Sequence, residues 1–222
     1  MTVRRPRRPD TPLQRQLAGA TARPTALDAF RLARRTFLRG DRIDMQALAR
    51  ALNVDRATLY RWVGSREQLL SEVLWSLIDP TLRNLRKACG NPGPPAATGL
   101  PPPDVSPPGL SPAASVITGA VREIMASPGM QRFLDREGEL ALRLLTTKAS
   151  GFENRLTGLI RELVEEEAAA GRLTALVPLD DLPYVLVRIM ESYIYLGLIT
   201  GEHPDPDRAA RVISALLPAG PG

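Results

Sequence analysis

Apolar residues recur at intervals of three and four along most of the chain, the spacing that lines one face of an α-helix. In the N-terminal third these runs are short, and a residue that can cap a helix precedes each of them. The four expected caps are Thr25, Asp44, Asp55 and Ser65. Thr25 with Asp28, and Ser65 with Gln68, also have the spacing of capping boxes.

The first of these helices is predicted to end at Gly40, and its inward stripe is predicted to comprise Leu27, Phe30, Ala33 and Phe37. The second helix is expected over 45–52 and the third over 56–63. The fourth begins after Ser65 and runs through Leu77. We expect Pro80 to disturb it, because proline lacks the backbone donor that a helix interior needs.

Helical spacing returns in the second half of the chain, where helices are predicted over 114–126, 129–147, 150–170, 179–200 and 207–217. A break is expected near Gly138, and Ser150 with Glu153 has the spacing of a further capping box. No alternating pattern is long enough to indicate a strand. The predicted fold class is therefore all-α.

Nine prolines between residues 90 and 113 interrupt the helical pattern. Such a run sustains neither helix nor sheet, so we expect an exposed, partly polyproline-like linker. Recognition of a PxxP segment by a partner is the alternative interpretation.

The net charge of +5 is unevenly distributed over the 222 residues. Residues 1–66 contain fifteen arginines and five aspartates and no Lys or Glu, so this third carries about +10 and the remainder about −5. Residues 1–24 are rich in Arg and Pro without helical spacing, which indicates a flexible basic arm. A basic segment on a mildly acidic body is typical of a polyanion-binding module attached to a part with another task.

Several classes of function find little support. A single Cys89 and a single His203 supply no thiolate or imidazole cage, so neither a metal nor a cofactor is expected. Glu137, Glu139 and Glu153 are candidates for acid–base chemistry, but we interpret them as solvated helical charges and expect no enzyme. Charged residues interrupt the longest apolar stretch, and no signal-peptide core follows the first arginines, so we expect no membrane span and a cytoplasmic location.

The segment 45–66 has the pattern of a helix-turn-helix, with two short helices joined by a three-residue turn. Ala49 is small where two such helices approach closely. Asn53 tolerates the left-handed backbone that a tight turn often needs. Val54 and Leu59 are predicted to pack beneath the turn.

The stretch Val54-Asp-Arg-Ala-Thr-Leu-Tyr-Arg-Trp-Val-Gly-Ser-Arg-Glu-Gln-Leu-Leu70 resembles the recognition helix and following helix of the TetR family of bacterial repressors. Together with Asp44-Met-Gln-Ala-Leu-Ala49 it is more similar to one branch, the QsdR-type regulators of quorum-sensing-signal degradation. A second similarity to that branch is Tyr184-Val-Leu-Val-Arg-Ile-Met-Glu-Ser-Tyr-Ile-Tyr195. The resemblance implies three parts, namely the arm at 1–24, a helix-turn-helix DNA-binding domain at 25–70, and a helical regulatory and dimerisation domain at 71–222 with the Pro-rich insert at about 90–113.

Geometry and resemblance together suggest which residues meet DNA. Arg56, Ala57 and Tyr60 are expected on the exposed N-terminal face of the third helix, the part that meets base edges. Thr58, Tyr60 and Arg61 resemble the family's phosphate-contacting positions. Arg66, in the first turn of the next helix, is a further candidate for holding a phosphate.

The helix expected around 182–199 is apolar almost all round, so it must be covered both by its own domain and by another chain. The next helix has one apolar face. Two such helices from each of two chains predict a four-helix dimer interface, as the resemblance also implies. A two-fold dimer in turn predicts an imperfectly palindromic double-stranded operator.

The larger domain is expected, from the resemblance, to hold a small apolar effector. The candidate lining residues are Trp75, Phe133, Phe152, Met190 and Tyr193. Arg188 and Glu191 are spaced to pair with one another on a helix, or to hold a polar group of the ligand. The resembled branch suggests a lactone or fatty-acyl compound. We therefore predict a repressor that a ligand releases from its operator; the alternative is a small-molecule-binding or interaction protein on the same fold without operator specificity.

Overall fold

The computed structural model describes residues 11, 23–90, 110–147 and 150–220, and all regular structure in these residues is helical. The helices are α2 (Ala26–Leu38), α3 (Met45–Ala51), α4 (Arg56–Val63), α5 (Arg66–Gly90), α6 (Pro112–Ala126), α7 (Pro128–Thr146), α8 (Phe152–Ala169), α9 (Leu182–Ile194), α10 (Leu196–Thr200) and α11 (Pro206–Leu216). The all-α prediction is confirmed. The predicted arm at 1–24 and the Pro-rich insert lie almost wholly outside the described residues.

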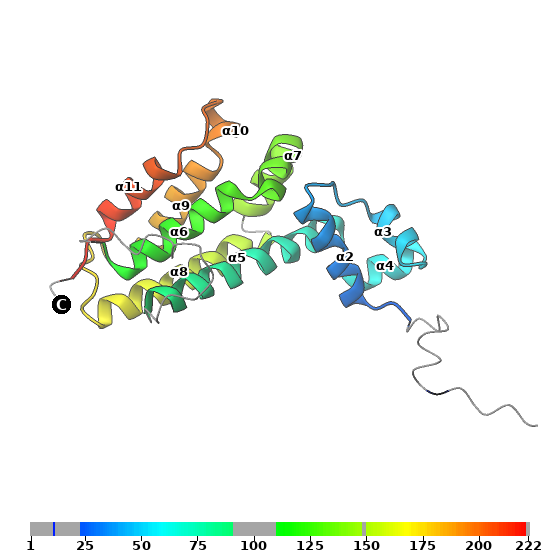
Figure 1. Cartoon of the computed structure of the whole chain (residues 1–222), viewed down its shortest axis with the longest axis horizontal. Coiled ribbons are helices and arrows are strands. Elements are labelled where there is room, and N and C mark those ends of the chain that lie inside the picture. The colour runs from blue at the N-terminus through cyan, green and yellow to red at the C-terminus, as the bar shows by residue number, and fades with distance from the viewer. Residues whose placement is uncertain (1–10, 12–22, 91–109, 148–149, 221–222) are drawn as a thin grey trace, which may run out of the picture.

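The helices form a small group and a larger bundle that share one long helix (Figure 1). Helices α2, α3 and α4 lie together at one end of the molecule, and α5 runs from this group along the bundle of α6 to α11. Within the bundle α5 packs along α6, α6 along α11, and α8 along α9. The boundary predicted at residue 70 falls inside α5, so one rigid element belongs to both parts.

The N-terminal helices begin where their caps predict. Thr25 and Asp28 form the expected capping box, and Ser65 and Gln68 exchange the two hydrogen bonds of the other. The predicted inward stripe of α2 is wrong at Leu27, which is 52% exposed. The buried stripe of α2 is Ala29, Ala33 and Phe37. Leu27 precedes Ala29 by two residues, which turns it about 200° away from that stripe.

Two expected features of the helices are absent. Helix α5 continues through Pro80, because the proline ring lies on the exposed side, where the carbonyl that loses its partner can face water. The capping box at Ser150 does not form either. The cap of α8 is Gly151, in a left-handed conformation, and the Glu153 carboxylate lies 3.4 Å from the Arg188 guanidinium instead.

One predicted break in the bundle helices is confirmed, and two helix boundaries differ from the prediction. Helix α7 is bent at Glu137, as the expected break near Gly138 predicts. Leu198 of α10 occupies the space in which a Cβ at Gly138 would lie, only 2.7 Å away. The single helix expected over 179–200 is split at Tyr195 into α9 and α10. Helix α6 already begins at Pro112, which stands at a first-turn position that tolerates proline, so the insert ends earlier than predicted.

The hydrophobic core is continuous from the small group into the bundle, with Phe37, Leu70 and Phe133 among its fully packed members. In the part of the chain that the structure describes, no helix is long and apolar enough to cross a membrane.

Gly129 marks the closest approach between α7 and α2. A Cβ at this position would lie 2.6 Å from the Phe37 carbonyl oxygen, a backbone atom that cannot move aside alone. Gly129→Ala should therefore lower the midpoint of urea unfolding. Gly158→Ala, in the middle of α8, should raise stability by about 0.5–1 kcal/mol, because a Cβ there would meet no atom within 4 Å beyond the adjacent helix backbone. Equal effects of the two substitutions would contradict the close contact between α2 and α7.

Candidate functional site

Helices α3 and α4 form the predicted helix-turn-helix. Asn53 adopts the expected left-handed backbone with a φ of 52°. The Val54 N–H donates to the Ala49 carbonyl at 3.0 Å, which closes the turn. Leu59 is completely buried beneath it, and Val54 is half-buried against the same core. The packing therefore fixes how α4 is presented to solvent.

The start of α4 is held by its cap. The Asp55 carboxylate accepts hydrogen bonds from the Thr58 N–H at 2.7 Å and from the Thr58 hydroxyl at 2.8 Å. These bonds hold the pKa of the Asp55 carboxyl below its usual range, so the cap stays ionised at neutral pH. The first turn of α4 is thus ordered before any partner binds.

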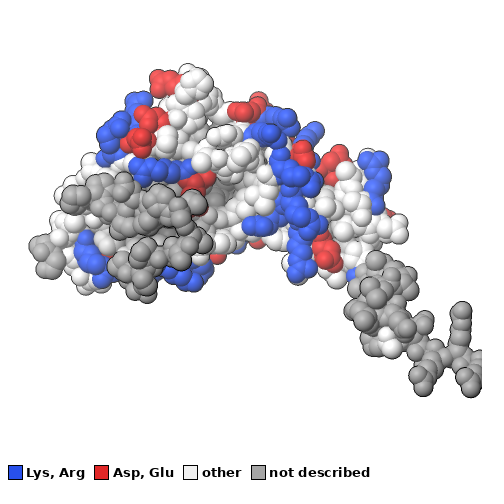
Figure 2. Space-filling model, viewed as in Figure 1, with Lys and Arg blue, Asp and Glu red and all other residues white. Residues whose placement is uncertain are grey.

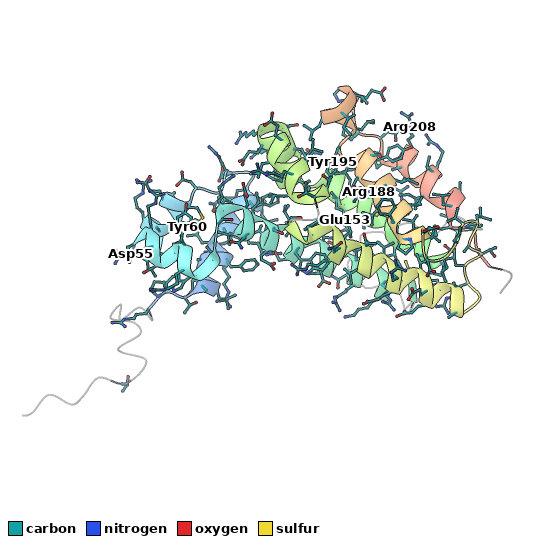
Figure 3. All side chains as sticks on the ribbon, turned by 180° about the vertical axis from the view of Figure 1, so that it is seen from behind. Asp55, Tyr60, Glu153, Arg188, Tyr195 and Arg208 are labelled. Carbon is teal, nitrogen blue, oxygen red and sulfur yellow. The ribbon has the colours of Figure 1, made fainter. Side chains whose placement is uncertain are left out.

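The outward face of α4 carries the residues that the sequence predicts there. Arg56, Ala57, Tyr60 and Arg61 are exposed, and Thr58 is half-buried beside its cap. The Arg56 guanidinium lies 6.0 Å from the centre of the Tyr60 ring. Neither Arg56 nor Arg61 has a salt-bridge partner among the described residues. Asp55 and Tyr60 lie at the end of the molecule remote from Tyr195 and Arg188 (Figure 3).

Arg66 lies away from the exposed face of α4. Its Nε donates to the Ile43 carbonyl at 2.6 Å, and its Nη2 lies 2.7 Å from the Glu137 carboxylate of α7. Only 20% of the Arg66 side chain is exposed, and its charge is already paired. The geometry therefore places Arg66 at the junction between the two parts rather than on the surface where a phosphate contact was expected.

Glu137 is correspondingly not the solvated helical charge that the sequence suggested. Its side chain is only 13% exposed, and Arg42 lies 3.4 Å from it on the other side. Glu139, two residues further along α7, is exposed as expected. The bend in α7 accounts for the difference, because the backbone of Glu137 itself departs from helical geometry.

Further arginines of α7 contact the end of α2. Arg132 donates to the Arg39 carbonyl at 2.7 Å, and Arg136 donates to the Gly40 carbonyl at 3.4 Å. These carbonyls follow the last turn of α2, where helix ends leave acceptors free. Figure 2 shows a band of Lys and Arg side chains where the small group of helices meets the bundle. We call this contact region, formed by α2, Arg42, Arg66 and the first half of α7, the junction.

The bundle encloses a small apolar cavity with a volume of about 20 Å³, which is room for about one water molecule. Of the predicted ligand residues, Phe152, Met190 and Glu191 line it. Its other lining residues are Ile78, Ile124, Met130, Leu145, Leu156, Ile194 and Tyr195. Tyr195 was not among the predicted ligand residues, although it is the last residue of the segment 184–195 that contains Met190 and Glu191.

The remaining predicted ligand residues lie outside this wall. Trp75 packs edge-on against Phe152, with ring centres 5.9 Å apart. Phe133 packs against Phe37 near the junction, at 5.8 Å. Tyr193 is half-buried and lines no part of the cavity.

A charged cluster lies behind the cavity. The Arg188 Nη2 lies 3.1 Å from the Glu191 carboxylate, as the spacing predicts, and 3.4 Å from the carboxylate of Glu153. Glu153 is only 16% exposed, so its interpretation as a solvated charge is wrong. Figure 3 shows Glu153, Arg188 and Tyr195 close together within the bundle.

Burial changes the protonation of this cluster. Burial raises the pKa of the Glu191 carboxyl to about 7, against the opposing charge of Arg188 and with a smaller contribution from Glu153. Burial and the nearby Glu191 charge also raise the pKa of the Tyr195 hydroxyl. Glu191 therefore titrates near neutral pH, whereas Tyr195 stays protonated.

Two polar groups of the cavity region have no hydrogen-bond partner among the described residues. Tyr195 is 4% exposed, and no described side chain or backbone group pairs with its hydroxyl. The Arg188 Nε is buried and also unpaired. Buried tyrosine hydroxyls usually find a partner, so the wall of the cavity has unused hydrogen-bonding capacity.

Large apolar side chains of α9, α10 and α11 remain exposed on the surface of the bundle. Leu182, Leu186 and Met190 face the core and are fully buried. Large exposed side chains lie on α9, α10 and α11, namely Tyr184, Leu198, Ile199 and Val212. Tyr184, Leu198 and Ile199 belong to the helix that the sequence predicted to need covering by another chain.

Acidic, histidine and cysteine side chains do not gather into a group able to hold a metal ion anywhere in the described ranges.

Comparisons with known proteins give one family. The family model "Tetracyclin repressor-like, C-terminal domain" matches residues 109–218. The solved structure of the TetR-family transcriptional repressor QsdR from R. erythropolis is 29% identical, with a TM-score of 0.64 over 86% of this chain and 93% of that one. A search of curated proteins finds no match.

A second solved structure, the TetR-family repressor AlkX from Dietzia sp. strain DQ12-45-1b, is 21% identical, with a TM-score of 0.53 over 88% of this chain and 95% of that one. At that identity the likeness shows the fold alone. The matched C-terminal domain and the similarity to QsdR over most of both chains agree with the helix-turn-helix in α3 and α4. The chain therefore belongs to the TetR family of transcriptional regulators.

Proposed function

We propose that this regulator is a repressor that binds an imperfectly palindromic operator as a homodimer and leaves it when a small, mainly apolar molecule binds the bundle. The exposed face of α4 is the observation that carries the proposal. It presents Arg56 and Arg61, which form no salt bridge with the described residues, on a helix whose first turn is already ordered by Asp55. Uncommitted cations on a preformed helix are what major-groove recognition requires.

Individual roles follow from position on α4. Arg56, Ala57 and Tyr60, near the start of the helix, are assigned to base edges, since the N-terminal residues of a recognition helix reach deepest. Thr58 and Arg61 are assigned to phosphates. Arg66 is assigned to the junction, because its guanidinium is paired with Glu137.

The exposed apolar side chains of α9, α10 and α11 support the dimer, and we propose that they form one face. Large exposed apolar patches on proteins often mark sites of interaction with another chain. A two-fold axis through this face would set two copies of α4 facing one side of a duplex. Their half-sites would lie about 34–36 Å apart or at a multiple of that spacing.

The small size of the cavity supports the release step. A ligand larger than one water molecule must separate the helices around the cavity, including the break between α9 and α10 at Tyr195. Leu198 of α10 rests on Gly138, next to the bend at Glu137, whose carboxylate holds Arg66. A ligand that binds an expanded bundle better would shift the population toward forms in which α4 is misplaced for the operator.

The alternative is a small-molecule-binding or interaction protein that kept the fold without operator specificity. The 29% identity to a protein described as a transcriptional repressor, over 86% of this chain, favours the first proposal.

Operator recognition is tested by fluorescence anisotropy on DNA from upstream of the protein's own gene, comparing a palindromic fragment with a scrambled one. Arg56→Ala should reduce the preference for the palindrome by ~1–3 kcal/mol, because it removes a base contact. Arg61→Ala is the matched control and should weaken both DNAs equally and lower the salt dependence, since phosphate contacts carry no sequence information. Wild-type protein without any preference would favour the alternative function.

The dimer face is tested by Ile199→Glu, which places a charge on a side chain that is 64% exposed within this face. We expect sedimentation equilibrium to show a shift from dimer to monomer, because an unpaired charge is costly to bury. Leu176→Glu is the control, since Leu176 is 60% exposed in the connection between α8 and α9. A dimer that survives Ile199→Glu and dissociates with Leu176→Glu would place the interface elsewhere.

The junction is tested by Glu137→Gln, which weakens the pairing with Arg66 and Arg42 while keeping the shape of the side chain. We expect operator affinity to fall by about fivefold, equivalent to about 1 kcal/mol, with no change in sequence preference. Glu139→Gln, on the exposed side of the same helix, should leave affinity unchanged. The junction would have no role in placing α4 if both variants bind as the wild type does.

A further inference from the structure

We infer that the cavity takes an apolar molecule with an uncharged amide-like head, which donates a hydrogen bond to Glu191 and accepts one from the Tyr195 hydroxyl, and that it discriminates against carboxylates. The inference rests on the proposed function, because it assigns a chemical class to the effector of the same site. The evidence is the polarity of the cavity wall, which is apolar except at these two residues.

The hydrocarbon part of the wall fixes the body of the ligand. Side chains from α5 to α9 surround the cavity, and eight of its ten lining residues are apolar, among them Ile78, Met130 and Leu156. Such a surface stabilises hydrocarbon at roughly 25 cal/mol per Å² of apolar area removed from water. A charged or heavily hydroxylated body would lose its hydration without replacement.

The polar part of the wall fixes the head. Tyr195 is 4% exposed and lines the cavity, and its hydroxyl has no partner among the described residues, so it can donate to a ligand carbonyl without breaking an existing bond. Glu191 is 6% exposed, and Arg188 Nη2 occupies only part of the capacity of its two oxygens. A carboxylate accepts about four hydrogen bonds, so an N–H of the ligand can share it. One head with adjacent N–H and C=O groups satisfies both residues.

The charge of the cluster disfavours an anionic head. Arg188 is the only cation that faces Glu191 among the described groups, and it is shared with the carboxylate of Glu153 from α8. The side chains that α5, α6 and α7 contribute to the cavity wall, namely Ile78, Ile124, Met130 and Leu145, carry no charge. When Glu191 is ionised, the cluster holds two carboxylates and one guanidinium. A ligand carboxylate would add a third negative charge in a largely buried site, where repulsion is less screened than in water.

Protonation of Glu191 modulates this discrimination. Because burial raises the pKa of Glu191 to about 7, the group is mainly ionised at pH 8 and mainly protonated at pH 6. Discrimination against carboxylates should therefore be stronger at pH 8. An uncharged head should bind at both pH values, because a protonated Glu191 still keeps an acceptor oxygen.

The test is calorimetric titration of the full-length protein with decanamide and with decanoate, two probes that share a hydrocarbon chain and differ in the head. At pH 8 decanamide should bind at least about tenfold more tightly than decanoate, and the ratio should shrink at pH 6. Tyr195→Phe should weaken decanamide by about tenfold, since it removes one hydrogen bond to the head of the ligand. Tyr193→Phe is the control, because Tyr193 does not line the cavity and should leave binding unchanged.

Glu191→Gln separates charge from shape, and it should bring decanoate close to decanamide in affinity. Equal affinity of the wild type for decanoate and decanamide would overturn the inference. It would mean that the ligand carboxylate displaces Glu191 from Arg188. The proposed effector site would survive this result. Failure of both probes to bind would overturn the inference and remove this cavity as the effector site. Operator recognition is measured separately, so it would stand or fall on the Arg56→Ala titration.

Discussion

A part-buried ion pair, that of Arg66 with Glu137, links the start of α5, directly after α4, to the bend in α7. Both side chains are largely buried, and separating them would leave each charge with only its weaker partner, the Ile43 carbonyl for Arg66 and the more exposed Arg42 for Glu137. Arg66 also donates to the Ile43 carbonyl, directly before α3. The same guanidinium therefore holds the helix-turn-helix, the start of α5 and the bend in α7 at one point. Small displacements of α7 must be followed by the others or must break the pair.

The sequence was sufficient for most features that arise from local chemistry. Caps such as Thr25 and Asp55, the turn at Asn53 and the exposed face of α4 each depend on residues within four positions of one another, and such interactions can be read from spacing. The long-range pairs could not be read in this way. Nothing in the spacing of Arg66 and Glu137, 71 residues apart, indicates that they meet.

The errors at Glu153 and Tyr195 have the same origin. Glu153 has the spacing of a capping residue, and in a single helix that interpretation is sound, but the neighbouring helix brings Arg188 within 3.4 Å and the carboxylate pairs there instead. Tyr195 lies in an apolar run and carries no local signal of a cavity. Tertiary packing overrides a local preference most readily where an ionic partner becomes available in a dry environment.

The cavity and the junction are connected by packing rather than by a chain of hydrogen bonds. Tyr195 stands at the break between α9 and α10, and three residues later Leu198 fills the space that the absent side chain of Gly138 leaves open. Glu137 is the adjacent residue, and it lies where α7 bends. Close-packed contacts of this kind do not compress. If a ligand moves α10, Leu198 must therefore either lose its contact with Gly138 or move the bend in α7 with it. The conformation of α7 at Glu137 would then decide whether Arg66 stays paired, and this is the route by which the proposed effector site would be coupled to α4.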